Sequence, residues 1–191
     1  MRNFVRPLIL SAALLFVVGC GSTTTQTNVN VVEPEYPESY QMYTSADGWS
    51  IRYPDTWSVD DTNYETSGVV HFGAPSQSQS FRGNLGVTKT DTEFTADMID
   101  YEDLRSAIKE ALETSGATNV ETSVVQLPAG EAVRGDTQFS REGLSFGVTQ
   151  VQIYRDYTGF VLTYMADTDE FGEFKTDAEL MMQSFKPAVQ E

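Results

Sequence analysis

The amino-acid sequence predicts an α+β fold, an antiparallel β-sheet flanked by helices. In its second half, four long segments alternate apolar and polar residues and are joined by short polar connections, as in β-hairpins. Two other segments repeat apolar residues at spacings of three and four, which is typical of an amphipathic helix. One sheet covered by two helices is the simplest architecture that buries both helical stripes.

The composition indicates one folded domain and excludes several kinds of site. Hydrophobic residues make up 40% of the 191 residues and aromatic residues 12%, enough apolar surface for a packed core. Lys and Arg number 12 against 28 Asp and Glu, a formal charge of −16. This charge argues against nucleic acid as a partner, because phosphates require a cationic surface. A single Cys and a single His exclude an internal disulfide and a multi-histidine metal site.

Residues 1–19 are interpreted as a lipoprotein signal peptide. Arg2 and Arg6 precede an apolar run over residues 8–18, which is too short to cross a hydrocarbon core of roughly 30 Å. The ending Val-Val-Gly-Cys resembles a bacterial lipobox, which implies cleavage before Cys20 and a covalent lipid on its sulfur. Such a lipid would anchor the mature chain to a membrane. The alternative is an ordinary signal peptide followed by a chance cysteine.

Residues 20–42 are predicted to be the lipidated cysteine and a flexible tether. They are rich in Ser, Thr, Gln, Asn, Pro and Glu, a composition that gives a random-coil reach of roughly 25 Å. A short edge strand through Val29, Val31 and Val32 is the alternative. The folded domain is expected over residues 43–187, with 188–191 as a C-terminal tail.

The predicted domain begins with short strands. Residues 49–53 alternate apolar and polar side chains up to Pro54, which cannot donate to a strand ladder. A second short strand over residues 57–59 ends at an acidic pair, and further strands are expected over 69–72 and 85–90.

A long helix should follow residue 95. Thr95 or Asp97 is expected to cap its start, and Gly116 to end it. Its predicted buried stripe consists of Met98, Tyr101, Leu104, Ile108, Ala111 and Leu112.

Four strands and a second helix complete the predicted domain. The strands are expected over residues 120–127, 132–139, 144–154 and 159–166. The apolar face of the last helix consists of Phe171, Phe174, Ala178, Met181 and Phe185.

Three segments resemble the PsbP-like family. They are WSIRYPDTW at residues 49–57, GFVLTY at 159–164 and MQSFKP at 182–187, which resemble the family's opening strand, late core strand and last helix. The resemblance covers about residues 43–187 and implies the Mog1/PsbP-type α/β/α sandwich. It also implies a relation to bacterial lipoproteins of the DcrB-like and LpqN-like groups, and binding or assembly rather than catalysis. The extended loops of the plant photosystem subunits have no match here, so no photosynthetic role is implied.

No catalytic constellation stands out. A Ser-His-Asp triad would need His71, the only imidazole, which lies in an apolar strand, and no G-x-S-x-G motif presents a serine. We expect His71 to be a structural or exposed strand residue, Tyr53 and Trp57 to be core rather than a ligand platform, and the protein not to be an enzyme. A weak hydrolase using a carboxylate pair is the alternative, because acids are abundant although no pair is distinguished.

A calcium loop is the weaker interpretation of residues 167–172. Asp167 and Asp169 occupy its first and third positions, but Phe171 and Ala178 replace the fifth and twelfth ligands. We expect instead that Asp167 or Thr168 caps the last helix. No cofactor is predicted apart from the lipid on Cys20.

The expected function is that of a membrane-anchored lipoprotein on the extracytoplasmic side of the cell envelope. It would bind or assemble another envelope protein; an electrostatic surface protein without a specific ligand is a further alternative. Loss of Arg2 and Arg6 on cleavage changes the formal charge from −16 to −18. Acids at the two predicted helix starts are expected to recruit a cationic partner, although capping and solubility also explain them: Asp97, Asp100, Glu102, Asp103, Asp169 and Glu173.

Overall fold

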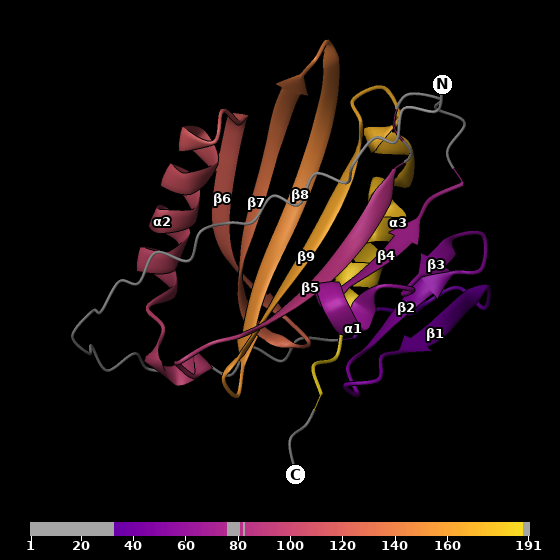
Figure 1. Ribbon diagram of the computed structural model, residues 1–191, viewed down its shortest axis with the longest axis horizontal. Coiled ribbons are helices and arrows are strands. Elements are labelled where there is room, and N and C mark those ends of the chain that lie inside the picture. The colour runs from indigo at the N-terminus through magenta and orange to yellow at the C-terminus, as the bar shows by residue number, and fades with distance from the viewer. Residues whose placement is uncertain (1–32, 76–80, 82, 189–191) are drawn as a thin grey trace.

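The predicted α+β fold is confirmed. A computed structural model of the protein describes residues 33–75, 81 and 83–188. Within these residues, seven strands form one antiparallel sheet and two strands form a smaller one, with α-helices packed against them (Figure 1).

The elements follow one another along the chain in four groups. First come β1 (Tyr40–Thr44), β2 (Ser50–Pro54), β3 (Ser58–Asp60) and α1 (Tyr64–Ser67). Next come β4 (Val69–Gly73), β5 (Asn84–Asp91), the 3₁₀-helix η1 (Ala96–Met98) and α2 (Tyr101–Thr114). Four long strands follow, β6 (Thr118–Leu127), β7 (Gly130–Arg141), β8 (Leu144–Arg155) and β9 (Thr158–Asp167). The last is α3 (Phe171–Ser184).

The large sheet has the order β3-β4-β5-β9-β8-β7-β6. Strands β6 to β9 form a meander, and β5 from the first half of the domain pairs with β9. The β7–β8 connection consists of Glu142 and Gly143, with φ values of 53° and 81°. Positive φ at both positions matches the right-handed twist of the paired strands. The β8–β9 connection consists of Asp156 and Tyr157, and φ is positive at both residues.

Helices α2 and α3 cover opposite faces of the large sheet. Neighbouring residues of a strand point to opposite faces. On β7, Val133 packs with Ile108 and Leu112 of α2, whereas Ala132 belongs to the main core that contains Ala178 of α3. The sheet therefore lies between helices, as in the sandwich that the resemblance implied.

The small sheet closes one side of the main core. Trp49 and Ile51 are fully buried, and Trp49 Nε1 donates to the Tyr64 hydroxyl at 2.8 Å. The backbone N–H of Arg52 donates to Ser184 Oγ of α3 at 2.8 Å. Residues near the start of the domain are thus held to its last helix.

The folded part begins earlier than residue 43. Strand β1 starts at Tyr40, which is buried, and pairs with β2 in full register. Tyr36 packs against the main core as well. The predicted boundary placed these residues in the tether because two isolated tyrosines within a polar segment give no periodic signal.

Several details of the predicted helices were wrong. Met98 lies in η1 rather than in the long helix and is 67% exposed. The cap of α2 is Asp100, whose side chain accepts from the backbone N–H groups of Glu102 and Asp103 at 3.0 and 3.1 Å. The N-cap of α3 is Glu170, without a side-chain cap bond. Phe185 lies one residue beyond α3 but is fully buried, as its place in the apolar stripe predicted.

The signal peptide, Cys20 and the alternative strand through Val29, Val31 and Val32 lie outside the described residues. In the part of the chain that the structure covers, no helix is long and apolar enough to cross a membrane.

Candidate functional site

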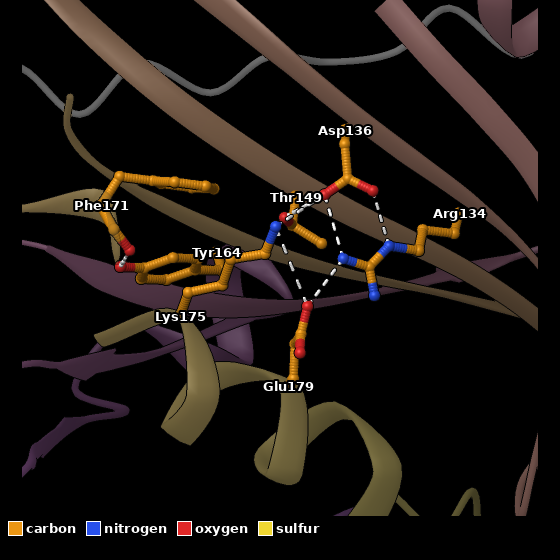
Figure 2. Close-up of polar contacts among 7 residues, drawn as sticks. All are labelled: Arg134, Asp136, Thr149, Tyr164, Phe171, Lys175 and Glu179. Atoms are coloured by element: carbon orange, nitrogen blue, oxygen red, sulfur yellow. Dashed lines mark hydrogen bonds and ion pairs between the residues drawn. The ribbon is translucent and has the colours of Figure 1, made fainter. Parts of the chain in front are cut away.

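Arg134 on β7 lies at the centre of a charged cluster between the large sheet and α3 (Figure 2). Its Nε donates to Asp136 Oδ2 at 2.6 Å and its Nη2 to Asp136 Oδ1 at 3.0 Å. The same Nη2 donates to Glu179 Oε1 of α3 at 2.8 Å. Arg134 and Asp136 are two residues apart on one strand, so they share the face that α3 covers.

The carboxylate of Asp136 accepts three hydrogen bonds from two side chains. Thr149 on β8 donates to its Oδ1 at 2.6 Å, in addition to the two bonds from Arg134. Burial alone would raise the pKa of Asp136, but the hydrogen bonds from Arg134 and Thr149 outweigh it and hold the pKa below its ordinary value. The hydrogen bond to Asp136 correspondingly raises the pKa of Arg134. Both groups are therefore ionised at neutral pH.

An aromatic pair lies beside the charged cluster. The rings of Phe171 and Tyr164 stack with centroids 5.0 Å apart, and the Tyr164 hydroxyl donates to the Phe171 carbonyl at 2.8 Å. A Cβ on Gly147 would lie 2.5 Å from the Phe171 ring. Glycine at this position thus allows the ring to lie directly on β8.

A recess of about 230 Å³ opens next to this pair. The Lys175 ammonium lies 5.5 Å from the centroid of the Phe171 ring. Its ion pairs to Asp136 and Glu179 are long, at 3.9 and 4.0 Å. Lys175 can therefore still donate to a small group that enters the recess. The remaining lining residues are mostly polar and include Asn119, Thr137, Gln138 and Thr168.

A second, smaller recess of about 140 Å³ lies near the β8–β9 turn. Asp47 at its rim accepts from Tyr64 at 2.6 Å and from Lys89 at 3.0 Å. These hydrogen bonds lower the pKa of Asp47. Arg155 and Asp156 also line the recess, and Arg155 Nε lies 3.6 Å from Asp156 Oδ2.

The first group of predicted recruiting acids surrounds the start of α2. Asp97, Asp100, Glu102 and Asp103 are all exposed. Asp100 is the helix cap, Glu102 pairs with Arg105 at 2.6 Å, and Asp97 accepts from the Thr95 hydroxyl. Capping is therefore part of what this group does.

The second group, Asp169 and Glu173, lies at the start of α3 and is also exposed. Helix α3 follows the end of β9 at Asp167, whereas the segment leading to α2 leaves β5 beside the beginning of β9. The two acidic groups thus lie at opposite ends of the sheet.

The calcium interpretation of residues 167–172 finds no converging ligands. Asp167 Oδ1 accepts from the backbone N–H of Asp169 at 3.2 Å. Among the described residues, no three His, Cys, Asp or Glu side chains come together as they would around a metal ion.

The other candidate residues are divided between core and surface. Trp57 is buried in the core, and Tyr53 packs against Phe72 with ring centroids 5.4 Å apart. His71 is exposed on β4, and partial desolvation lowers its pKa although the charge of Asp60 opposes the shift.

Sequence reasoning missed the cluster around Arg134. Two spacings could have indicated it: an Arg and an Asp two residues apart on a strand, and Lys175 and Glu179 four residues apart on a helix. Each spacing places two charges on one face. Only the fold shows that the charged face of the strand meets the charged face of the helix.

Comparison with known proteins finds solved structures with a similar fold. No family model and no curated protein matches the sequence. CyanoP, the cyanobacterial PsbP of Synechocystis sp. PCC 6803, has a TM-score of 0.52 at 14% identity, over 86% of this chain and 98% of its own. LpqN of Mycobacterium tuberculosis, described as involved in cell envelope biogenesis, has a TM-score of 0.54 at 16% identity, over 78% and 92%.

A third solved structure agrees with these two. PA94 of Pseudomonas aeruginosa, a protein of unknown function, has a TM-score of 0.55 at 16% identity, over 79% of this chain and 99% of its own. The alignments span nearly all of the three relatives, and the segments that resemble the PsbP-like family lie within the described domain. The chain therefore has the PsbP-like fold.

Proposed function

We propose that the chain is a membrane-anchored lipoprotein on the extracytoplasmic side of the cell envelope, where it acts as a non-catalytic binding or assembly module. The observation that carries this proposal is the fold shared with LpqN, a protein described as involved in cell envelope biogenesis.

The chemistry of the charged cluster supports binding rather than acid–base catalysis. A general acid or base works best when its pKa lies near the operating pH. Asp136 has a pKa below its ordinary value, and Arg134 is bound to two carboxylates. A carboxylate with a lowered pKa is a weak base, and its partners keep it from acting as an acid. The cluster instead joins β7, β8 and α3 around the recess.

The anchor is supported by the sequence around Cys20. The apolar run over residues 8–18 is too short to span a bilayer and ends at the lipobox-like cysteine. Two or more acyl chains on one cysteine give stable membrane attachment, whereas a single chain gives only reversible binding.

Replacing the cysteine tests the anchor. The full chain and its Cys20→Ser variant would be expressed in a bacterium with an alkyne-bearing fatty acid, then compared by labelling, intact mass and detergent phase partition. We expect the wild type to be processed, labelled and found in the detergent phase, and Cys20→Ser to be unlabelled. A wild-type protein that lacks label and enters the aqueous phase would contradict the anchor.

A further inference from the structure

Two exposed apolar side chains belong to the same end of the large sheet. Met98 is 67% exposed and Tyr157 is 58% exposed. The backbone N–H of Thr92, just after β5, donates to the Tyr157 carbonyl at 2.8 Å. Two residues later, the Phe94 ring packs on Tyr154 of β8 with centroids 5.5 Å apart. The segment that leads through η1 to α2 is thereby fixed beside the β8–β9 turn (Figure 1). We call Phe94, Met98 and Tyr157 the turn-end surface.

Tyr157 occupies a position where the fold favours glycine. In the β7–β8 turn the second connecting residue is Gly143, with φ of 81°; in the β8–β9 turn it is Tyr157, with φ of 63°. A bulky side chain is uncommon in this left-handed region, and glycine adopts it without a steric penalty. Backbone conformations of this kind are often kept at functional sites. A tyrosine thus stands at a turn position that glycine would adopt more easily, and its side chain is largely exposed to solvent.

The charge of the segment between β5 and α2 favours a cationic partner, and Arg155, the cation at the adjoining β8–β9 turn, lies 3.6 Å from Asp156 Oδ2. Residues 91–104 contain six acids and neither Lys nor Arg. Asp91, Glu93 and Asp97 are all exposed. An acidic surface repels the anionic headgroups of a membrane and attracts cationic protein segments. Exposed aromatic and methionine side chains supply apolar contact area for such a segment.

We propose that the turn-end surface docks a cationic segment of another protein, one that carries an apolar side chain between lysines or arginines. The apolar side chain would lie against Tyr157 and Met98, and the flanking cations would face Glu93 and Asp97. This inference rests on the proposed binding function and assigns it a surface and a partner chemistry. It does not depend on the recess beside Phe171.

A peptide titration tests the proposal. The probe is an amidated fluorescent peptide with lysines on both sides of a Trp-Leu pair, and binding to the mature full chain in zwitterionic nanodiscs is followed by anisotropy. If the chain proves to carry no lipid, the same titration is done in water, so failure of the anchor does not affect it. We expect Tyr157→Gly to weaken binding about tenfold or more while leaving thermal stability equal or higher. Met98→Ser should also weaken binding.

Matched controls separate docking from general attraction. Met42→Ser changes an exposed methionine on β1 and should leave affinity unchanged. A double variant that combines Glu93→Gln and Asp97→Asn should weaken binding and reduce its salt dependence. The control double variant, Asp169→Asn and Glu173→Gln at the opposite end of the sheet, should have a smaller effect on both. Equal affinity of the wild type and Tyr157→Gly would overturn the proposal. Equal binding of a peptide with serines in place of Trp-Leu would also overturn it.

Discussion

Arg134 holds its place through three hydrogen bonds to two carboxylates on different elements. Asp136 belongs to the same strand and Glu179 to α3. The side chains of all three are only about one-quarter to one-third exposed. Without Arg134, Asp136 would keep the hydrogen bond from Thr149, and among the described residues the only remaining cation near the two carboxylates would be Lys175, at 3.9 and 4.0 Å. Removing one partner of a partly buried ion pair costs more folding stability than the intact pair contributes, because the remaining charge stays partly desolvated.

Arg134→Met should therefore reduce the free energy of unfolding by about 1 to 3 kcal/mol at neutral pH, a range that allows for solvent screening. Arg141→Met is the control, since Arg141 is exposed and lies 3.8 Å from Glu142; it should change stability by no more than about 0.5 kcal/mol. Urea melts measure both. Equal effects would show that the Arg134 cluster does not stabilise the fold.

The pH dependence of this difference follows from Asp136. Its folded pKa lies below its ordinary value, so its stabilising contribution is present above the unfolded pKa of about 3.9. That contribution is lost as pH falls through the lower folded value. The stability gap between the wild type and Arg134→Met should consequently narrow in acid. A constant gap down to about pH 3 would contradict this account.

Non-local contacts explain why the sequence did not predict the cluster. Each pair of charges follows a local spacing, but Arg134 and Glu179 are 45 residues apart. Their contact depends on how α3 lies across β7. Gly147 is similar, because its role is apparent only once the Phe171 ring is placed on β8. Tyr157, by contrast, could have been noticed in the sequence as an unusual turn residue between two strands.

At the scale of elements, local patterns predicted most of the sheet and both long helices. Strands β6 to β9 are joined by short polar connections, so each pairs with its neighbour and the periodicity shows directly. Strand β1 was missed because it lies in a polar segment without a clear periodic signal, and helix α1 because it has only four residues. Met98 fitted the helical spacing of α2, but Asp100 caps the helix after it and leaves Met98 outside.

The stripe of α2 gives a prediction about packing. Ile108 and Leu112 are 9% and 6% exposed and pack with Val133 of β7. Leu112→Ala should lower the free energy of unfolding by about 2 to 5 kcal/mol, as truncation of buried aliphatic side chains does. Glu110→Ala, on the exposed side of the same helix, should cost no more than about 0.5 kcal/mol. Denaturant melts with equal shifts for both variants would mean that α2 is not held through this face.

For the whole molecule, the place where the chain enters the folded domain affects which partners the domain can reach. Glu33 forms an ion pair with Lys186 at 2.9 Å, and Ala188 lines the recess that includes Asp156 of the β8–β9 turn. The chain therefore enters the domain near the end that carries Tyr157. Cys20 precedes Glu33 by 13 residues, a span of at most roughly 45 Å. An anchor at Cys20 would limit the distance between this end and the membrane to roughly 45 Å, within reach of other membrane-associated proteins.

Photo-crosslinking in the living envelope tests most directly whether the chain is a binding module that acts through this end. A photoreactive phenylalanine would replace Tyr157 in the full chain, or Met42 as the matched exposed control. We predict a discrete protein adduct from position 157 that is absent from position 42 and is reduced by Glu93→Gln with Asp97→Asn. No protein adduct at position 157, or the same adduct from both positions, would contradict the account.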